Sequence, residues 1–237
     1  MSGHADERLS GALGRCGYHP RMTIDWNREV LDQIETHVQQ RLRPRLDGLS
    51  DEEYFWQPVP GCWTINRRGE SSAPISYGSG EFTWDYGPAS EAPEPMTTIA
   101  WRLGHMIECL ESMNGTHFGG PQTSVETFDY PGTAKEALQQ LDDAYDAWVS
   151  GVRGLGNSGL AEPQGSKSPA EFADAPVARL GLYTSVEVFH HGAEICLLRD
   201  LYLAEPSRQR SRTSFYAADG SRVGHVRRRL PRDRVRM

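Results

Sequence analysis

The segment from Leu180 to Tyr202 has apolar residues on every side of a helical wheel. A helix with this pattern is buried all round rather than on one face. Its centre nevertheless carries two glutamates and two histidines, Glu187, His190, His191 and Glu194. Charged groups inside a core are costly unless they are paired or coordinate a metal. The pattern therefore predicts a buried helix with a ligand-like centre.

Three other segments have the apolar periodicity of amphipathic helices. The four helices are expected over residues 25–46, 98–118, 133–155 and 176–204. Pro44 is expected to strain the last turn of the first helix, because it lacks an N–H to donate. Thr133 and Glu136 form a capping box at the start of the third helix. Asp174 is expected to be the N-cap of the fourth, with Pro176 near its first helical position.

The connection between the first two helices, residues 48–95, is rich in proline, glycine and aromatic residues. Ser50 is expected to cap a short helical turn at its start. The rest is expected to be an ordered loop, and ordered loops of this length are often lids or binding loops. Its tryptophans Trp56, Trp63 and Trp84 either line a substrate pocket or anchor the loop to the helices, and the sequence leaves both interpretations open.

These elements predict an all-α fold, namely an antiparallel four-helix bundle with a long aromatic, Pro- and Gly-rich loop between helices one and two. Within the 237 residues we expect a flexible N-terminal extension over 1–22, the bundle over 23–205 and a basic disordered tail over 206–237. The tail holds ten arginines and two aspartates, so the rest of a chain with a net charge of −7 is strongly acidic.

The composition limits the expected partners and compartment. Four widely spaced cysteines predict no disulfide framework, and no apolar run is long enough for a membrane span or a signal core. We therefore expect a cytoplasmic protein without a membrane partner. The basic tail lacks an aromatic platform or a binding fold, so we expect no nucleic-acid partner.

The candidate chemistry is that of a metal site between helices. Glu187 and His191 are four residues apart and share one helix face, so both can ligate one ion. His105, inside the second helix, is the candidate third ligand, which would leave an open position as in catalytic zinc and non-haem iron sites. Two alternatives stay open: the second pair His190 and Glu194, about one hundred degrees around the same helix, and a core His105 hydrogen-bonded to a glutamate.

Four stretches carry a family resemblance: GLSDEEYFWQPVPGCWTI at residues 48–65, WRLGHM around His105, HFGG at residues 117–120 and EVFHHGAEICLLRDLY in the fourth helix. With them the chain resembles the DinB-like four-helix-bundle superfamily, in particular its actinobacterial branch, over about residues 22–203. That superfamily holds a divalent metal, often zinc or nickel. The mycothiol-dependent maleylpyruvate isomerase N-terminal domain is similar in using His, Glu and His, which implies His105, Glu187 and His191 here.

The resemblance implies thiol chemistry. The ion would hold a low-molecular-weight thiol such as mycothiol as its thiolate for attack on a small electrophile. Trp56, Trp63 and Trp84 would shape an apolar pocket over the open position, while Glu194 and Glu108 would orient the histidines.

The function expected from the sequence is thus a metal-dependent thiol S-transferase, or a related hydrolase-like enzyme. The isomerase's additional C-terminal domain has no counterpart here, so its own reaction is not transferred. The alternative is a non-catalytic bundle, stress-related or dimerising through a second copy, with a structural metal or none.

Overall fold

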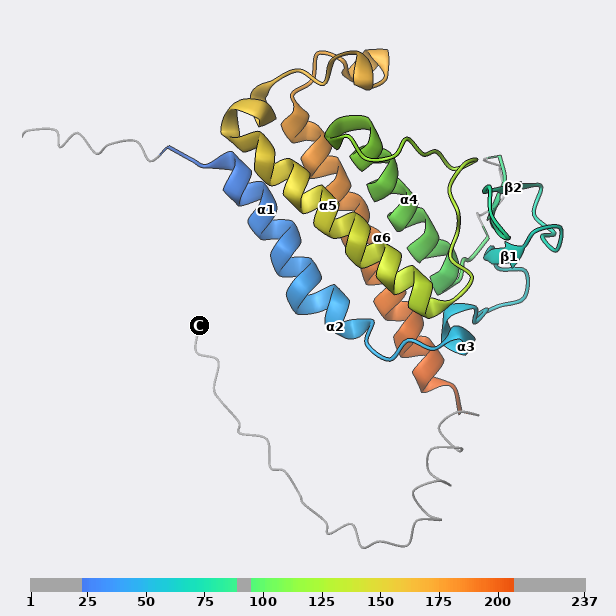
Figure 1. Cartoon of the computed structure of the whole chain (residues 1–237). Helices are drawn as coiled ribbons and strands as arrows, with labels where there is room; N and C mark the ends of the chain where they lie inside the picture. Colours follow the sequence, from blue (N-terminus) through green and yellow to red (C-terminus); the bar gives the residue numbers. More distant parts are fainter. Residues whose placement is uncertain (1–22, 89–94, 207–237) are drawn as a thin grey trace, which may run out of the picture.

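The structure is a computed structural model that describes residues 23–88 and 95–206, and it is mostly helical (Figure 1). The expected N-terminal extension and all but the first residue of the expected tail lie outside these ranges. The helices are α1 (Trp26–His37), α2 (Arg43–Arg45), α3 (Asp51–Tyr54), α4 (Ile99–Phe118), α5 (Ala134–Ala161) and α6 (Val177–Ala204). Over the described residues, none of these helices has the length and apolarity that crossing a membrane requires.

The long helices lie side by side and bury one core. α4 packs against α5 and α6, and α1 packs against the same two helices from the other side (Figure 1). Apolar side chains from all four helices join a single buried cluster, for example Ile34, Met106, Trp148 and Ile195. The predicted helical character of the chain is therefore confirmed.

The end of the first helical segment is irregular. Between α1 and α2, residues Val38–Leu42 form a π-helical turn in which the Arg43 N–H donates to the Val38 carbonyl. Pro44 follows directly and has no N–H to donate to the preceding turn, so a wider turn is accommodated there. The irregularity thus falls where Pro44 was expected to cause it.

Both ends of α4 and the start of α5 lie where the sequence predicts them. The Thr98 hydroxyl accepts the Trp101 N–H at 3.2 Å, and α4 ends at Gly119, whose φ of +81° is a left-handed conformation that suits glycine. Thr133 caps α5 through the Glu136 N–H at 3.1 Å, although the Glu136 carboxylate accepts from Gly132 rather than from Thr133.

Two helix ends differ from prediction. α5 continues past the expected end to Ala161, across a kink at Gly156 with φ of +60°. The predicted N-cap at Asp174 is wrong, because α6 begins at Val177 after Pro176, with no side-chain cap. Backbone hydrogen bonds from Val177 to Glu162 and from Gln164 to Ala175 hold this segment in a closed connection instead.

The expected loop between the first two long helices contains a small sheet, so the all-α prediction is corrected. Strands β1 (Ile65–Arg67), β2 (Ile75–Tyr77) and β3 (Phe82–Tyr86) pair antiparallel in the order β1-β3-β2. The buried Asp85 carboxylate accepts the Thr64 N–H, the Asn66 amide and the Ser71 hydroxyl at 2.6 to 2.9 Å. One buried acceptor therefore organises residues that are far apart in this segment.

The sheet segment closes on itself at the start of α4. The backbone N–H of Trp63 donates to the Met96 carbonyl at 2.9 Å, and the Trp63 carbonyl accepts the Thr98 N–H at 3.0 Å. Residues 63 and 97 are therefore paired as in a β-bridge. Two indoles add cross-links: Trp84 Nε1 donates to the Trp101 carbonyl and Trp101 Nε1 donates to the Asp85 carbonyl. The sheet is thereby fixed to the first turns of α4.

The absence of a side chain at Gly104 brings the sheet close to α4. A Cβ placed on Gly104 would lie 2.8 Å from Ile65 Cδ1 and 3.1 Å from the Tyr130 ring. A larger residue there would therefore force the Ile65 side chain or the Tyr130 ring to shift. The close approach places the sheet directly beside the next residue, His105.

A buried ion pair ties α6 to α3. Arg199 Nε and Nη2 donate to the two Glu53 oxygens at 2.6 and 3.0 Å, and Nη1 donates to the Arg45 and Asp47 carbonyls. Arg199 is 8% and Glu53 3% exposed. This guanidinium therefore fixes the chain between α2 and α3 against α6.

Candidate metal centre

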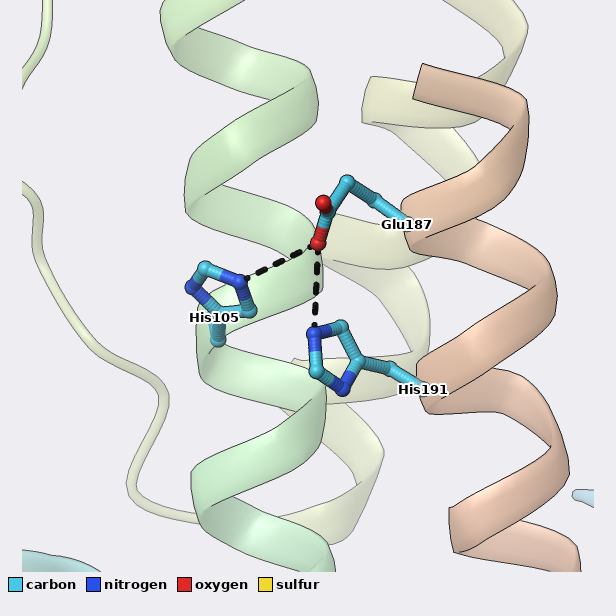
Figure 2. Close-up of side chains that lie close together, drawn as sticks. All are labelled: His105, Glu187 and His191. Carbon is cyan, nitrogen blue, oxygen red and sulfur yellow. Dashed lines mark ion pairs between the residues drawn. The ribbon is translucent and has the colours of Figure 1, made fainter. Parts of the chain in front are cut away.

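Three side chains from two helices meet beside the sheet (Figure 2). His105 projects from α4, while Glu187 and His191 project from successive turns of α6. His191 Nε2 lies 3.3 Å and His105 Nε2 3.6 Å from Glu187 Oε2. One ligand atom from each residue lies within 4.8 Å of the others. We refer to His105, Glu187 and His191 as the donor group.

The donor group lies at the edge of the core. The His191 side chain is 8% exposed, whereas those of His105 and Glu187 retain 29% and 20% of their exposure. The group is therefore held by buried neighbours on the His191 side and remains accessible from the His105 side.

The hydrogen bonds of His191 determine which ring nitrogen faces the group. Its Nδ1 lies 2.8 Å from Glu194 Oε2 and 3.3 Å from an Arg102 nitrogen. Arg102 also lies 3.1 Å from Glu194 Oε2. A guanidinium can only donate hydrogen bonds. The short contact between Nδ1 and Glu194 is therefore best explained by an Nδ1–H that donates to Glu194, with Arg102 as a second donor to the same carboxylate. In that tautomer the lone pair of Nε2 faces Glu187.

Electrostatics keep His105 neutral. Burial, followed by the neighbouring His191, lowers the pKa of His105 to about 4, although Glu187 acts in the opposite direction. A neutral imidazole has a free lone pair, which is the form that binds metals. The 3.6 Å contact to Glu187 is too long for a hydrogen bond. The group thus gathers imidazole and carboxylate lone pairs around one point, an arrangement that suits a cation.

The alternative pair is arranged differently. His190 Nε2 lies 3.4 Å from Glu194 Oε1, and with His191 these residues form a second possible donor group on α6 alone. The His190 side chain is 62% exposed, and the Arg102 cation already lies against Glu194. A second positive charge beside Arg102 would be repelled. The geometry therefore favours the donor group that includes His105.

The three tryptophans of the connecting segment lie at different distances from the donor group. Trp84 stacks on the His105 ring with centroids 5.9 Å apart and planes 15° apart. Trp63 is one ring further away, since it contacts Trp101, which itself lies 5.7 Å from His105. Trp56 packs edge-on against Tyr202, about three turns beyond His191 along α6.

Sequence reasoning did not single out three residues that contact the donor group. Trp101 lies against His105, an Arg102 nitrogen lies 3.3 Å from His191 Nδ1, and Tyr183 interacts with the Glu187 carboxylate. Partial burial, followed by Glu187, raises the pKa of Tyr183 to about 12, so this hydroxyl keeps its proton. The signal for two of them was the four-residue spacing, because Trp101 precedes His105 and Tyr183 precedes Glu187 by one turn.

The other expected orienting residue, Glu108, is in neither donor group formed by the described residues. Its neighbour Cys109 follows His105 by one turn. Burial, followed by Glu108 and Glu187, raises the pKa of Cys109 to about 12. This side chain is therefore a thiol, not a thiolate, at neutral pH.

Replacing Glu108 with Gln is expected to stabilise the protein at alkaline pH. Burial, followed by Glu126, raises the pKa of Glu108 to about 7 from its ordinary 4.5. The folded protein therefore favours the protonated acid, and the wild type loses this stability as pH rises from about 4.5 through about 7. Urea unfolding at pH 8 should show a gain of about 1 to 3 kcal/mol for Glu108→Gln.

The same variant should gain little at pH 5, where Glu108 is already protonated. The exposed Glu171 provides a matched control, because Glu171→Gln removes the same charge outside the core. An equal gain at both pH values, or an equal gain for Glu171→Gln, would contradict the assignment.

Comparison with known proteins places these residues in a family context. A family model described as the DinB superfamily matches residues 36–195, more than half of the chain and including the whole donor group. No curated protein and no solved structure matches the chain.

Proposed function

The chain belongs to the DinB superfamily, and from this membership and the donor group we propose that it is a divalent-metal-dependent enzyme of the thiol S-transferase type. It would activate a low-molecular-weight thiol, similar to mycothiol, for attack on a small electrophile. The observation that carries the proposal is the convergence of His105, Glu187 and His191 from two helices around one point.

The donor types fit zinc or nickel. Two imidazoles suit both ions, zinc also accepts a carboxylate oxygen as a further ligand, and three protein ligands leave a position for substrate. Glu194 supports an open position, because it binds the far nitrogen of His191 and does not close the group. When bound, the ion would stabilise a thiolate near neutral pH.

The protein's own residues have distinct parts in this proposal. Glu194 fixes the tautomer and orientation of His191, and Arg102 holds Glu194 in place. Tyr183 orients the Glu187 carboxylate through its hydroxyl. The high pKa of Cys109 favours a thiol brought from solution as the nucleophile.

The surroundings would provide an apolar wall on one side of the reacting groups. Trp84 and Trp101 cover the His105 ring, and Trp63 extends this wall. Trp56 is not part of the wall, since it packs on Tyr202. We further propose that the long helices form the antiparallel four-helix bundle expected from the sequence, over residues 23–205, with an isomerase-like His-Glu-His set.

Turnover of a chromogenic aryl halide with mycothiol tests the function. Purified protein loaded with zinc or nickel should form the thioether conjugate. Chelation should abolish the enzymatic rate, and adding the ion back should restore it. His190→Ala is the matched control and should retain the rate. Metal-independent rates, or no turnover with mycothiol, bacillithiol or glutathione, would contradict the proposed function.

One observation favours the second candidate, a dimerising non-catalytic protein. Along α6, the side chains of Leu182, Val186, Leu197 and Leu201 are all at least 45% exposed. Their spacings of 4 and 11 residues place them on one helix face. A second copy packed on this face would bury them. A metal-loaded protein that is dimeric in light scattering and inactive with every thiol would support this candidate.

A further inference from the structure

A cavity of about 370 Å³ lies where α4 ends and α6 begins. It is enclosed by the last turns of α4, the first turns of α6 and the connection that contains the short 3-10 helices Gly165–Lys167 and Ala170–Phe172. This volume is in the range of small-molecule sites. None of the three tryptophans expected to line a pocket borders it.

The wall formed by the connection is fixed by hydrogen bonds. Backbone hydrogen bonds join Gln164 to Ala175, Gly165 to Ala173 and Val177 to Glu162 at 2.8 to 2.9 Å. The buried Gln164 side chain donates to the Pro176 carbonyl and accepts the Ser168 hydroxyl. The cavity is thus preformed, and little ordering would be needed on binding.

The charged side chains that line the cavity are both positive. Lys167 and Arg179 border it, and none of its lining residues is acidic, in a chain whose net charge is −7. The Arg179 guanidinium lies 4.8 Å above the Phe172 ring, which restricts its position. These groups favour an anion.

The remainder of the lining is largely apolar. Met113 from α4, Phe172 from the connection and Leu180 from α6 provide hydrocarbon and aromatic surface. A free inorganic anion would leave this surface in contact with water. A ligand with both an anionic group and an apolar body satisfies both parts of the cavity.

Tyr183 connects this cavity with the donor group. Its side chain lines the cavity, and it interacts with the Glu187 carboxylate one turn further along α6. A ligand in the cavity would therefore lie beside a residue that contacts the metal centre.

We propose that the cavity binds a small amphipathic organic anion, with its carboxylate between Lys167 and Arg179 and an aromatic or branched aliphatic body against Met113, Phe172 and Leu180. Its use as a substrate of the thiol reaction rests on the proposed function. Its binding does not, because the cationic and apolar groups belong to the protein itself.

Two fluorescent probes of similar shape test the proposal. The anion 8-anilinonaphthalene-1-sulfonate should bind the full-length protein about tenfold more tightly than neutral N-phenyl-1-naphthylamine. Lys167→Gln and Arg179→Gln should each weaken binding of the anionic probe by about three- to tenfold and leave the neutral probe unchanged. Lys135→Gln, at an exposed lysine outside the cavity, is the matched control and should change neither affinity.

Three further measurements test whether the probes bind in this cavity and which class of ligand it prefers. Thr116→Trp, which fills the cavity from α4, should abolish binding of both probes while circular dichroism remains native. Phenylacetate should displace the anionic probe, and inorganic phosphate at the same concentration should not. His105→Ala should retain probe binding, which separates this site from the metal centre if the proposed function fails.

The proposal would be overturned by equal affinity for the two probes or by full affinity in Lys167→Gln and Arg179→Gln. Wild-type binding in a folded Thr116→Trp protein would place the probe elsewhere. Displacement by inorganic phosphate as effective as that by phenylacetate would remove the role of the apolar surface.

Discussion

Replacing His105 or His191 with alanine is expected to remove the divalent ion from the purified protein, whereas His190→Ala is expected to leave it bound. Each of the first two changes removes one of the three side chains that we propose as ligands and that converge on a single point. Loss of a residue that only orients a ligand costs about 10- to 100-fold in metal affinity, so loss of a ligand should cost more than about 100-fold. Elemental analysis after dialysis gives the ion content per chain.

His190 is a strict control for this experiment, because it neighbours His191 and has the same side chain but is mostly exposed. Glu194→Gln should be intermediate, with about tenfold weaker binding, since an amide still contacts Nδ1 but fixes its proton less firmly. Unchanged ion content in both His105→Ala and His191→Ala would refute the donor group. Loss in His190→Ala with retention in His105→Ala would assign the ion to the second group instead.

Replacing Arg199 with methionine is expected to lower the free energy of unfolding by about 3 to 5 kcal/mol. The change leaves the Glu53 carboxylate buried without its guanidinium and the Arg45 and Asp47 carbonyls without their donor. Urea unfolding at pH 7 and 25 °C, followed by circular dichroism, measures the difference.

Arg28→Met is the matched control, because Arg28 pairs with Asp32 at 3.4 Å on the surface, where its side chain is 73% exposed. It should cost less than about 0.5 kcal/mol. The double variant Arg199→Met/Glu53→Leu should recover part of the loss, since it no longer buries an unpaired charge. A cost for Arg199→Met no larger than that for Arg28→Met would show that the buried pair is not a determinant of stability.

The helices could be predicted because their cause is local. Each long helix buries an apolar face with a regular period, and its ends follow the sequence where Thr98, Gly119 or Thr133 terminates it. The start of α6 could not be predicted in the same way. It is set by the backbone hydrogen bond from Val177 to Glu162, between residues at the two ends of a connection.

The sheet had no comparable local signal. β1 and β2 contain three residues each, too few to establish an alternating pattern. Their pairing depends on Asp85, whose carboxylate collects donors from Thr64, Asn66 and Ser71. Contacts between distant segments decide which polar residue of a long loop becomes a buried acceptor. The periodicity of the sequence contains no information about such contacts.

Prediction of the candidate site from the sequence was limited by a similar problem. Spacing on one helix identifies pairs that share a face, but two such pairs occur on α6, and the rotation of α6 relative to α4 decides between them. Arg102 on α4 carries the deciding charge, because it lies against Glu194 and leaves Glu187 to face His105. Its position relative to α6 follows only from the packed helices.

The pairing of Trp63 with Thr97 and Thr98 has a consequence for how the segment that carries the sheet can vary in length. The chain therefore leaves Trp63 and returns to Thr98 at neighbouring positions, and Trp84 and Trp101 hold the strands between them against α4. The entropy of closing such a segment changes only slowly with its length. A change in the length of this segment is therefore expected to leave the register of the helices that carry the donor group unaltered.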